Sequence, residues 1–371
     1  MGNRMAGLAL ALGMGAAAVH AGQVVVGQVA PLSGLDANQG RAYGVGMQLA
    51  FDAANKAGGI AGNTVVLVRK DDGGRQEATL KLTQQLIAEH KPVVLAGYFG
   101  IASIDLMARS GVLEKENIAL VGYRAAQVRP ETANLFNVRA SLRDEMFKIA
   151  EQLASIGIKR MAIVYEQGPG AVALMTSASE AAHMGKATLV GMVGYPAGTA
   201  DVTPQVQAMI RVQPQAILLI ASGAAAAAFI EQYRQAGGSA QLFATSGVDM
   251  EQLASRLTDQ QMQGVAISQV MPSPYKMSSR IAKEFTDAAA RAGKLEVPVS
   301  YAMIEGYVAA KVILEALRRQ GKNPTREGTI HAMGAMYYEL GGYSVSYRPD
   351  IRAGSKFVEL TILGGKGKLR Q

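Results

Sequence analysis

The chain has 371 residues, of which 49% are hydrophobic and 18% are charged, and it contains no cysteine and no tryptophan. This composition predicts a globular protein of about two to three folding units rather than a disordered chain. The lack of cysteine excludes a disulfide scaffold, thiolate metal sites and cysteine nucleophiles. The net charge of +8 comes from scattered Lys and Arg with few aromatic neighbours, so we expect no nucleic-acid partner.

The first 21 residues have the pattern of a secretory signal peptide. Arg4 precedes an apolar run from Met5 to Val19, and Val19-His20-Ala21 is a suitable cleavage point. The run is shorter than the ~20 residues that a bilayer span needs. We therefore expect residues 1–21 to be a cleaved signal peptide. A lipid anchor would need a cysteine, so the mature protein is expected to be periplasmic and not a lipoprotein.

From Val24 onward, β-rich runs alternate with helical patterns. The predicted strands are Val24–Ala30, Thr64–Lys70, Val93–Tyr98 and Ile118–Tyr123. The predicted helices between them are Gly40–Lys56, Gln76–His90 and Ala102–Leu113. Such a series predicts a parallel sheet that is covered by helices on both faces. Arg124–Ala140, rich in polar residues, is interpreted as a crossover.

The same pattern starts again at residue 160. Its predicted strands are Arg160–Glu166, Ala187–Tyr195, Ala216–Ser222 and Gln241–Ser246, and its helices are Ala171–Met184, Thr203–Val212 and Ala225–Ala236. A third section has predicted strands Gly264–Val270, Tyr343–Tyr347 and Phe357–Leu363 and helices Ser279–Ala292 and Ser300–Gln320. Pro272-Ser273-Pro274 is interpreted as a second crossover.

The sequence therefore predicts an α/β protein of two Rossmann-like lobes joined by a hinge of more than one strand. We expect residues 22–142 and 271–347 to form lobe 1, and residues 143–270 and 348–371 to form lobe 2. Several crossings between lobes permit hinge bending and resist free tumbling.

Enzymatic sites are poorly supported. The three histidines after the signal peptide lie beside no candidate nucleophile, no Gly-x-Ser-x-Gly occurs, and no histidine pair has metal-ligand spacing. Gly168–Ala173 matches Gly-x-Gly-x-x-Ala, but the next strand ends without the acid that a nucleotide ribose needs. Pro169 also lacks a backbone N–H for a phosphate. We expect no catalytic residues, no metal and no cofactor.

Polar residues gather where the predicted parallel strands end, which is where open α/β sheets bind ligands. The candidate ligand-binding residues there are Ser33, Tyr98, Phe99, Gly100, Ser103, Tyr123 and Arg124 in the first series, and Tyr165, Glu166, Ser222, Ser246 and Asp249 in the second. Backbone N–H groups at the following helix N-termini suit a carboxylate. The aromatic residues offer flat apolar walls, and Arg124 could clamp an anion.

Several motifs resemble a known family. Gly27–Gly34, Ala57–Gly62, Arg69–Asp72 and Phe136–Ala140 are similar to segments of the type I periplasmic solute-binding proteins of ABC transporters, in the Leu/Ile/Val-binding class. The resemblance implies a Venus-flytrap fold that traps a small solute and delivers it to an inner-membrane ABC permease. We expect a monomer. A periplasmic sensor component is the alternative function, and an exported α/β enzyme is a weaker one.

The resemblance also implies where a solute binds. In the family, the first lobe holds an amino acid's carboxylate, here at Tyr98–Ser103 and Gly122–Ala125. The acid that usually holds the ammonium falls on Ser246, and Gln39 stands where amino-acid binders often have tyrosine. If Glu166 or Asp249 turns inward, an amino acid fits; if neither does, a carboxylate without an amine or a neutral amide fits better.

Overall fold

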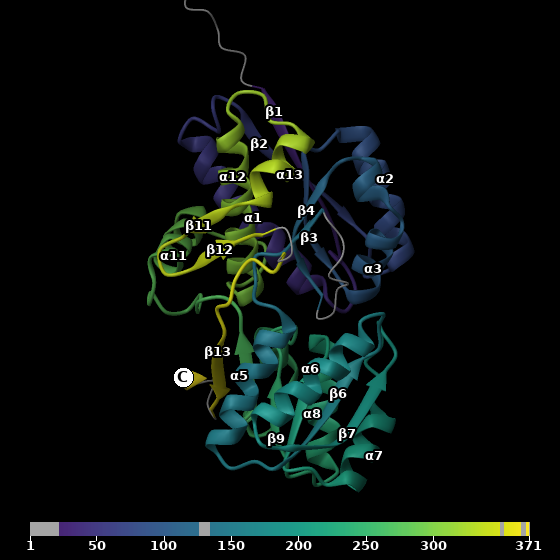
Figure 1. Ribbon diagram of the computed structural model, residues 1–371. Coiled ribbons are helices and arrows are strands. Elements are labelled where there is room, and N and C mark those ends of the chain that lie inside the picture. Colours follow the sequence, from purple (N-terminus) through teal and green to yellow (C-terminus); the bar gives the residue numbers. More distant parts are fainter. Residues whose placement is uncertain (1–21, 126–133, 349–351, 365–368, 371) are drawn as a thin grey trace, which may run out of the picture.

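Two α/β lobes, one above the other in Figure 1, make up the structure, a computed structural model that describes residues 22–125, 134–348, 352–364 and 369–370. Each lobe has a mainly parallel sheet with helices on both faces, so the predicted fold class is confirmed. The expected signal peptide, residues 1–21, lies outside the described residues. In the part of the chain that is described, no helix is long and apolar enough to cross a membrane.

The first lobe is built on a five-stranded parallel sheet in the order β2-β1-β3-β4-β5. Its strands are β1 (Gln23–Ala30), β2 (Thr64–Asp71), β3 (Val94–Phe99), β4 (Ala119–Arg124) and β5 (Leu135–Phe136). The helices of this lobe are α1 (Ala37–Lys56), α2 (Gln76–His90), α3 (Ile101–Arg109), α4 (Val112–Lys115), α11 (Arg280–Ala292), α12 (Tyr301–Gln320) and α13 (Arg326–Gly334). The strands are runs of β-branched and apolar residues, which suit a sheet that is buried on both faces.

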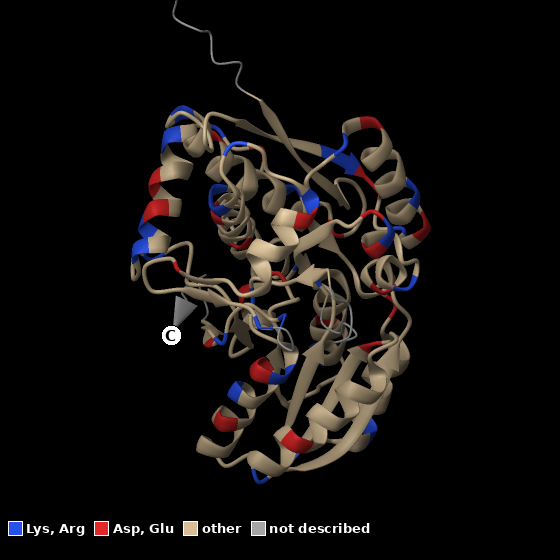
Figure 2. Cartoon of the chain, turned by 45° about the horizontal axis from the view of Figure 1, so that its top comes forward, with Lys and Arg blue, Asp and Glu red and all other residues tan. Residues whose placement is uncertain are grey.

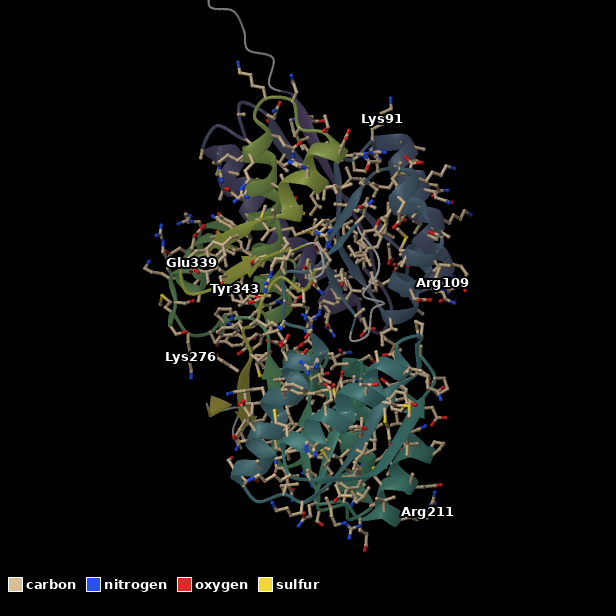
Figure 3. All side chains as sticks on the ribbon, viewed as in Figure 1. Lys91, Arg109, Arg211, Lys276, Glu339 and Tyr343 are labelled. Carbon is tan, nitrogen blue, oxygen red and sulfur yellow. The ribbon has the colours of Figure 1, made fainter. Side chains whose placement is uncertain are left out.

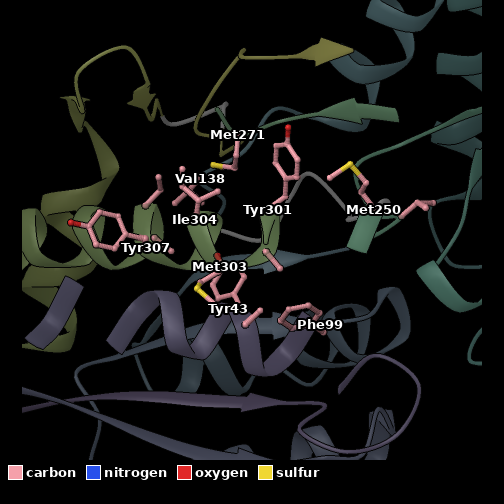
Figure 4. Close-up of a cluster of buried hydrophobic side chains, with 14 of the residues drawn as sticks. Tyr43, Phe99, Val138, Met250, Met271, Tyr301, Met303, Ile304 and Tyr307 are labelled. Carbon is pink, nitrogen blue, oxygen red and sulfur yellow. The ribbon is translucent and has the colours of Figure 1, made fainter. Parts of the chain in front are cut away.

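Close packing of α1 against α12 brings the late part of the chain into the first lobe. A Cβ at Gly46 would lie 1.9 Å from the carbonyl oxygen of Met303, and one at Gly306 would lie 2.1 Å from that of Tyr43. Only glycine allows these backbones to come so close. Figure 4 shows Tyr43, Met303 and Ile304 packed together along this contact, and Tyr301 nearer the second lobe. The first turns of α12 are thereby packed against α1, and the helix also contacts β3 and β4.

The second lobe has a seven-stranded sheet in the order β14-β13-β10-β9-β8-β6-β7. Its parallel strands are β6 (Arg160–Glu166), β7 (Thr188–Tyr195), β8 (Ala216–Ile220), β9 (Gln241–Ala244) and β10 (Ala266–Gln269); β13 (Glu359–Leu363) joins β10 antiparallel, and β14 (Leu369–Arg370) follows it. The helices are α5 (Leu142–Ser155), α6 (Ala171–Met184), α7 (Thr203–Val212), α8 (Gly223–Gln235), α9 (Met250–Arg256) and α10 (Asp259–Met262).

Segments that follow β5, follow β10 and precede β13 lie together at the hinge. The Tyr343 hydroxyl is 2.7 Å from the carbonyl oxygen of Val138 and 3.1 Å from that of Val270. The Asn137 N–H donates to the Arg352 carbonyl at 2.8 Å. Tyr343, labelled in Figure 3, is carried by the hairpin β11 (Tyr337–Glu339) and β12 (Ser344–Ser346). These bonds support the multi-strand hinge; the lobe boundaries given above stay a prediction.

The predicted strands agree with the observed ones to within two residues at each end, and the differences lie mainly among helices. The predicted helix Ala102–Leu113 is two helices, because Gly111 between them has a φ of 66°. The crossover Arg124–Ala140 contains the short strand β5, and α5 was not predicted. The signal for α5 is its capping box, in which Ser141 and Asp144 bond each other's backbone N–H groups.

Candidate functional site

Charged residues on the outer helices are largely paired. Figure 2 shows both signs side by side on these helices, and pairs such as Lys283–Asp287 at 2.7 Å connect successive turns. Among the described residues, no group of His, Cys, Asp or Glu could hold a metal ion. The charges that need a further explanation lie between the lobes.

A cavity of about 610 Å³ separates the two lobes and takes its walls from both. In lobe 1 the walls follow β1, β3, β4 and β5, and in lobe 2 they follow β6, β8 and β9. These are the carboxyl ends of parallel strands, where helix N-termini and loops converge. The volume is typical of a small-molecule site.

Seven of the thirteen predicted site residues line this cavity: Gln39, Phe99, Gly100, Tyr123, Arg124, Glu166 and Ser222. Gln39 lies in α1, and the other six come from the ends of β3, β4, β6 and β8, which are far apart in the sequence. The side chain of Ser222 also caps α8, where it accepts from the Ala225 N–H. Phe99 lies edge-on to Tyr43, with ring centroids 5.7 Å apart, which fixes its position in the wall.

Tyr98 and Ser103 lie outside the cavity wall. Successive residues of a strand point to opposite faces, so Phe99 faces the cavity and Tyr98 packs among the residues beneath α2 and α3. There the Tyr98 hydroxyl is 2.9 Å from Oγ1 of Thr83, and Oγ of Ser103 is 3.0 Å from Oγ1 of Thr79. Burial is the main reason that the pKa of Tyr98 is raised. Both polar groups are satisfied within the lobe.

The remaining four predicted residues also have partners elsewhere. Ser33 is exposed, and its backbone N–H donates to Asp71 at 3.2 Å. Tyr165 packs against the apolar core of lobe 2. Asp249 caps α9, where its Oδ1 accepts from the Gln252 N–H at 3.0 Å. Ser246 belongs to a buried network at the hinge.

That network joins two arginines to two glutamates from both lobes. Arg124 pairs with Glu305 of α12 at 2.7 Å and donates to the Ser246 carbonyl at 2.8 Å. Arg139 lies 3.6 Å from Glu305 and 3.7 Å from Glu145, and it donates to the Ser246 hydroxyl. Glu145 in turn accepts from the Ser246 N–H at 2.7 Å. Ser246 is therefore held by groups of lobe 1, of the hinge and of lobe 2.

Two positive and two negative side chains make the network neutral. Burial would lower the pKa of Arg139, but the charges of Glu305 and Glu145 outweigh it and raise that pKa. Arg124 is only 8% exposed, and its Nε is the one nitrogen of the guanidinium without a partner. Glu305 and Ser246 thus already engage most of the guanidinium donors that could bind an anionic ligand.

Asp36 and Glu166 are different, because these two cavity-lining acids have no ion pair among the described residues. Asp36 is the N-cap residue of α1, but its side chain does not cap the helix, and its buried Oδ1 has no hydrogen-bond partner in the described ranges. Burial raises the pKa of Asp36; Arg124 opposes this effect and Asp249 adds to it. Burial, followed by the charge of Asp36, raises the pKa of Glu166 to about 7. One carboxyl comes from each lobe, so the pair spans the cleft.

We predict that Glu166→Gln stabilises the protein increasingly as pH rises. Glu166 has a folded pKa of about 7, above its ordinary 4.5, so the wild type loses stability as pH rises between these values. Below this window the carboxyl is protonated in both states, and above it the penalty is constant. Denaturant unfolding at several pH values should show the difference between variant and wild type growing across the window.

Glu180→Gln, at an exposed position of α6 that pairs with Arg143, is the matched control. The difference between this variant and the wild type should not grow across the same window. A Glu166→Gln difference that is constant with pH would contradict the prediction.

The lobes touch at two points beside the cavity. Nε2 of Gln252 in lobe 2 donates to the Leu35 carbonyl in lobe 1 at 3.0 Å. Gly168, at the start of the loop after β6, lies so near Ile101 that a Cβ there would come within 2.6 Å of its Cγ2. These contacts bring the two rims together over the cavity.

Several cavity residues were not predicted from the sequence, among them Leu35, Asp36, Arg139, Glu145 and Arg352. Asp36 had a readable signal, since an acid just before a helix is a typical N-cap. Arg139 lies in the motif Phe136–Ala140, but two of its partners, Ser246 and Glu305, are more than a hundred residues away. Arg352 precedes β13 and reaches the cavity only through the hinge.

Comparison with known proteins gives one consistent result. The sequence model of the periplasmic binding protein family matches residues 23–358. The Leu/Ile/Val-binding protein homolog 6 of Brucella melitensis is 25% identical over 351 residues, which cover 91% of this chain and 87% of the homolog. The crystal structure of a substrate-binding periplasmic protein from Ralstonia solanacearum is similar at 34% identity, with a TM-score of 0.87 and coverage of 93% of this chain and 99% of that one. An extracellular ligand-binding receptor from Verminephrobacter eiseniae, at 24% identity, has a TM-score of 0.86 and coverage of 94% and 100%.

Proposed function

Because this chain belongs to the periplasmic binding protein family, we propose that it captures a small solute between its lobes and delivers it to an inner-membrane ABC permease. The observation that carries the proposal is the 610 Å³ cavity, whose walls are shared by two lobes that a multi-strand hinge connects. We further propose that residues 1–21 direct export to the periplasm and are removed there, and that the mature protein acts as a monomer.

We expect the lobes to close on the solute because each lobe supplies part of the cavity wall. Lobe 1 supplies Gln39, Phe99 and Tyr123, and lobe 2 supplies Glu166 and Ser222. A solute makes its full set of contacts only when both walls reach it, so it stabilises the closed state by its differential affinity. A permease can then distinguish loaded from empty protein by the relative position of the two lobes.

The solute class includes amino acids and small carboxylates or amides. An amine needs a buried counter-charge, since an unpaired cation costs several kcal/mol. Glu166 in the cavity wall supports an amine, although Ser246 replaces the acid that the family usually has. Arg124 supports an anion more weakly, because Glu305 already pairs with it and only its Nε is free to donate.

Solution scattering with and without the solute tests this proposal. The solute that co-purifies with the protein is first identified by mass spectrometry and then added back to stripped protein. We expect the radius of gyration to fall on binding, and the free energy of unfolding to rise by about 2.7 kcal/mol at a hundredfold excess over Kd. Identical dimensions with and without a bound solute would overturn the proposal, as would recovery of a chemically altered solute.

A further inference from the structure

Most charged groups in the cavity wall already have partners, and the few that do not indicate what the cavity binds. The charged residues that line it are Asp36, Arg124, Arg139, Arg143, Glu145, Glu166, Arg352 and Lys356. Arg124, Arg139 and Glu145 belong to the neutral network around Glu305. Arg143 pairs with Glu180 at 2.9 Å, and Lys356 pairs with Asp144 at 2.8 Å. Within the described residues, this leaves Asp36, Glu166 and Arg352 without an ion pair.

The end of the cavity at Asp36 and Glu166 carries two carboxyl groups and one amide, and Glu166 accepts hydrogen bonds from the Tyr195 hydroxyl and the Gly198 N–H within its own lobe. Asp36 leaves its Oδ1 buried and unpartnered, and Glu166 faces it from the other lobe. Gln39, one helical turn after Asp36, is 4% exposed and lines the same cavity. No hydrogen bond to its side chain is found in the described part of the chain. Two carboxylates and an amide oxygen suit a group with several N–H donors and a positive charge.

Arg352 lies at a different end. Its guanidinium covers the Phe136 ring at 4.5 Å from the centroid, and its buried Nη1 has no hydrogen-bond partner among the residues that the structure describes. Phe136 ends β5, whereas Asp36 follows β1, and β3 and β4 lie between these two strands. Three strand spacings of about 4.8 Å put strands β1 and β5 roughly 14 Å apart, and Asp36 and Arg352 lie beside the ends of these two strands.

Apolar side chains form much of the rest of the cavity wall, and β3 and β4, which carry Phe99 and Tyr123, lie between β1 and β5. The apolar side chains are Phe99, Tyr123 and Leu135 from lobe 1, and Leu142, Leu174 and Ile220 from lobe 2. An α-amino acid carries both of its charged groups on one carbon, so it cannot reach the two ends together. A longer molecule with its charges at opposite ends can.

We propose that the cleft selects an elongated zwitterion, with an amine held between Asp36 and Glu166, a carboxylate held by Arg352, and an apolar body between them. This inference rests on the proposed function and names the solute class of the same site. The amine would also tie the lobes together, because its two carboxylate partners come from different lobes.

Calorimetric titration with a matched series tests the inference. The probes are 4-aminobutanoate, 6-aminohexanoate and 8-aminooctanoate, with hexanoate, hexylamine and leucine as comparators. We expect the best ω-amino acid to bind at least about tenfold more tightly than each comparator. Each comparator lacks at least one of the charge-assisted hydrogen bonds, and the loss of about 1.4 kcal/mol corresponds to a tenfold change in Kd. No binding of any ω-amino acid, or leucine or hexanoate binding equally well, would overturn the inference.

Variants identify the groups responsible. Asp36→Asn and Glu166→Gln should each reduce the preference for the ω-amino acid over hexanoate about tenfold, and Arg352→Gln should reduce its preference over hexylamine. Asp52→Asn, at an exposed position of the same helix as Asp36, should change neither preference. Unchanged preferences in all three cavity variants would remove the assignment.

The experiments distinguish a failure of the zwitterion inference from a failure of the proposed solute capture. A co-purifying solute that closes the lobes but carries no amine overturns the zwitterion inference and leaves solute capture intact. A protein whose lobes close on no solute at all contradicts solute capture itself.

Discussion

Replacing Glu305 by glutamine is expected to lower the free energy of unfolding by about 3–5 kcal/mol, the usual cost of removing one partner from a buried ion pair. Glu305 is 1% exposed and serves both Arg124 and Arg139. Without its charge, Arg139 keeps Glu145 as a partner, whereas Arg124 is left without an ion pair among the described residues. Denaturant unfolding followed by circular dichroism measures the loss.

Glu315→Gln is the matched control on the same helix. Glu315 pairs with Arg318 and Arg319, which are exposed, so its loss should cost less than about 1 kcal/mol. Adding Arg124→Gln to Glu305→Gln should cost less than the sum of the two single changes, since the double variant removes one charge of each sign. Equal losses for Glu305→Gln and Glu315→Gln would show that the network contributes no net stability.

The network explains why the sequence alone could not locate the site fully. Arg124 was correctly placed at a strand end, but its main partner lies 181 residues later in the chain. That contact depends on the close approach of α1 and α12 at Gly46 and Gly306, which no local pattern reveals. An arginine that looks free in a sequence is therefore already neutralised in the fold.

Local patterns predicted the strands well because their apolar runs are short and bounded by Gly, Pro and polar residues. These local patterns did not show which of two neighbouring residues at a strand end faces the cavity. Tyr98 and Phe99 were both assigned to the site, yet their alternation puts only Phe99 in the cavity wall. The family resemblance is confirmed over residues 23–358, so the order of motifs carried more information than any single residue.

Ser246 stands at the position where the family resemblance implies the acid that holds a ligand's ammonium group, but in this structure it is part of the hinge network. The position lies at the junction of the lobes, but its backbone and hydroxyl are engaged by Arg124, Arg139 and Glu145. An acid at this position would stand beside Glu145 and face repulsion from it. Glu145, which also lines the cavity, is engaged by this network, and the cavity-lining carboxylate of lobe 2 that has no ion pair among the described residues comes from Glu166, at the end of a different strand.

Gly168→Val should weaken solute binding about tenfold to a hundredfold and leave the folding of each lobe unchanged. Gly168 is half-buried in a loop, and it meets Ile101 only where the lobes touch. A side chain there would overlap Ile101 in the closed state, at a cost of about 1–3 kcal/mol. The apparent Kd rises in proportion as the closed state becomes rarer, tenfold for each 1.4 kcal/mol.

Calorimetry with the co-purifying solute measures the change in affinity, and scattering of the solute-free variant should show a larger radius of gyration than the wild type. Gly334→Val, at the end of α13 with open space around it, is the control and should affect neither quantity. The free energy of unfolding of the solute-free variant separates two explanations of a weaker affinity. If the free energy of unfolding falls by as much as the binding free energy, the substitution acts on folding. If the free energy of unfolding is unchanged, the substitution acts on closure. Wild-type affinity in the variant would mean that the lobes bind their solute without approaching each other at this point, and the contact between Gly168 and Ile101 would then play no part in capture.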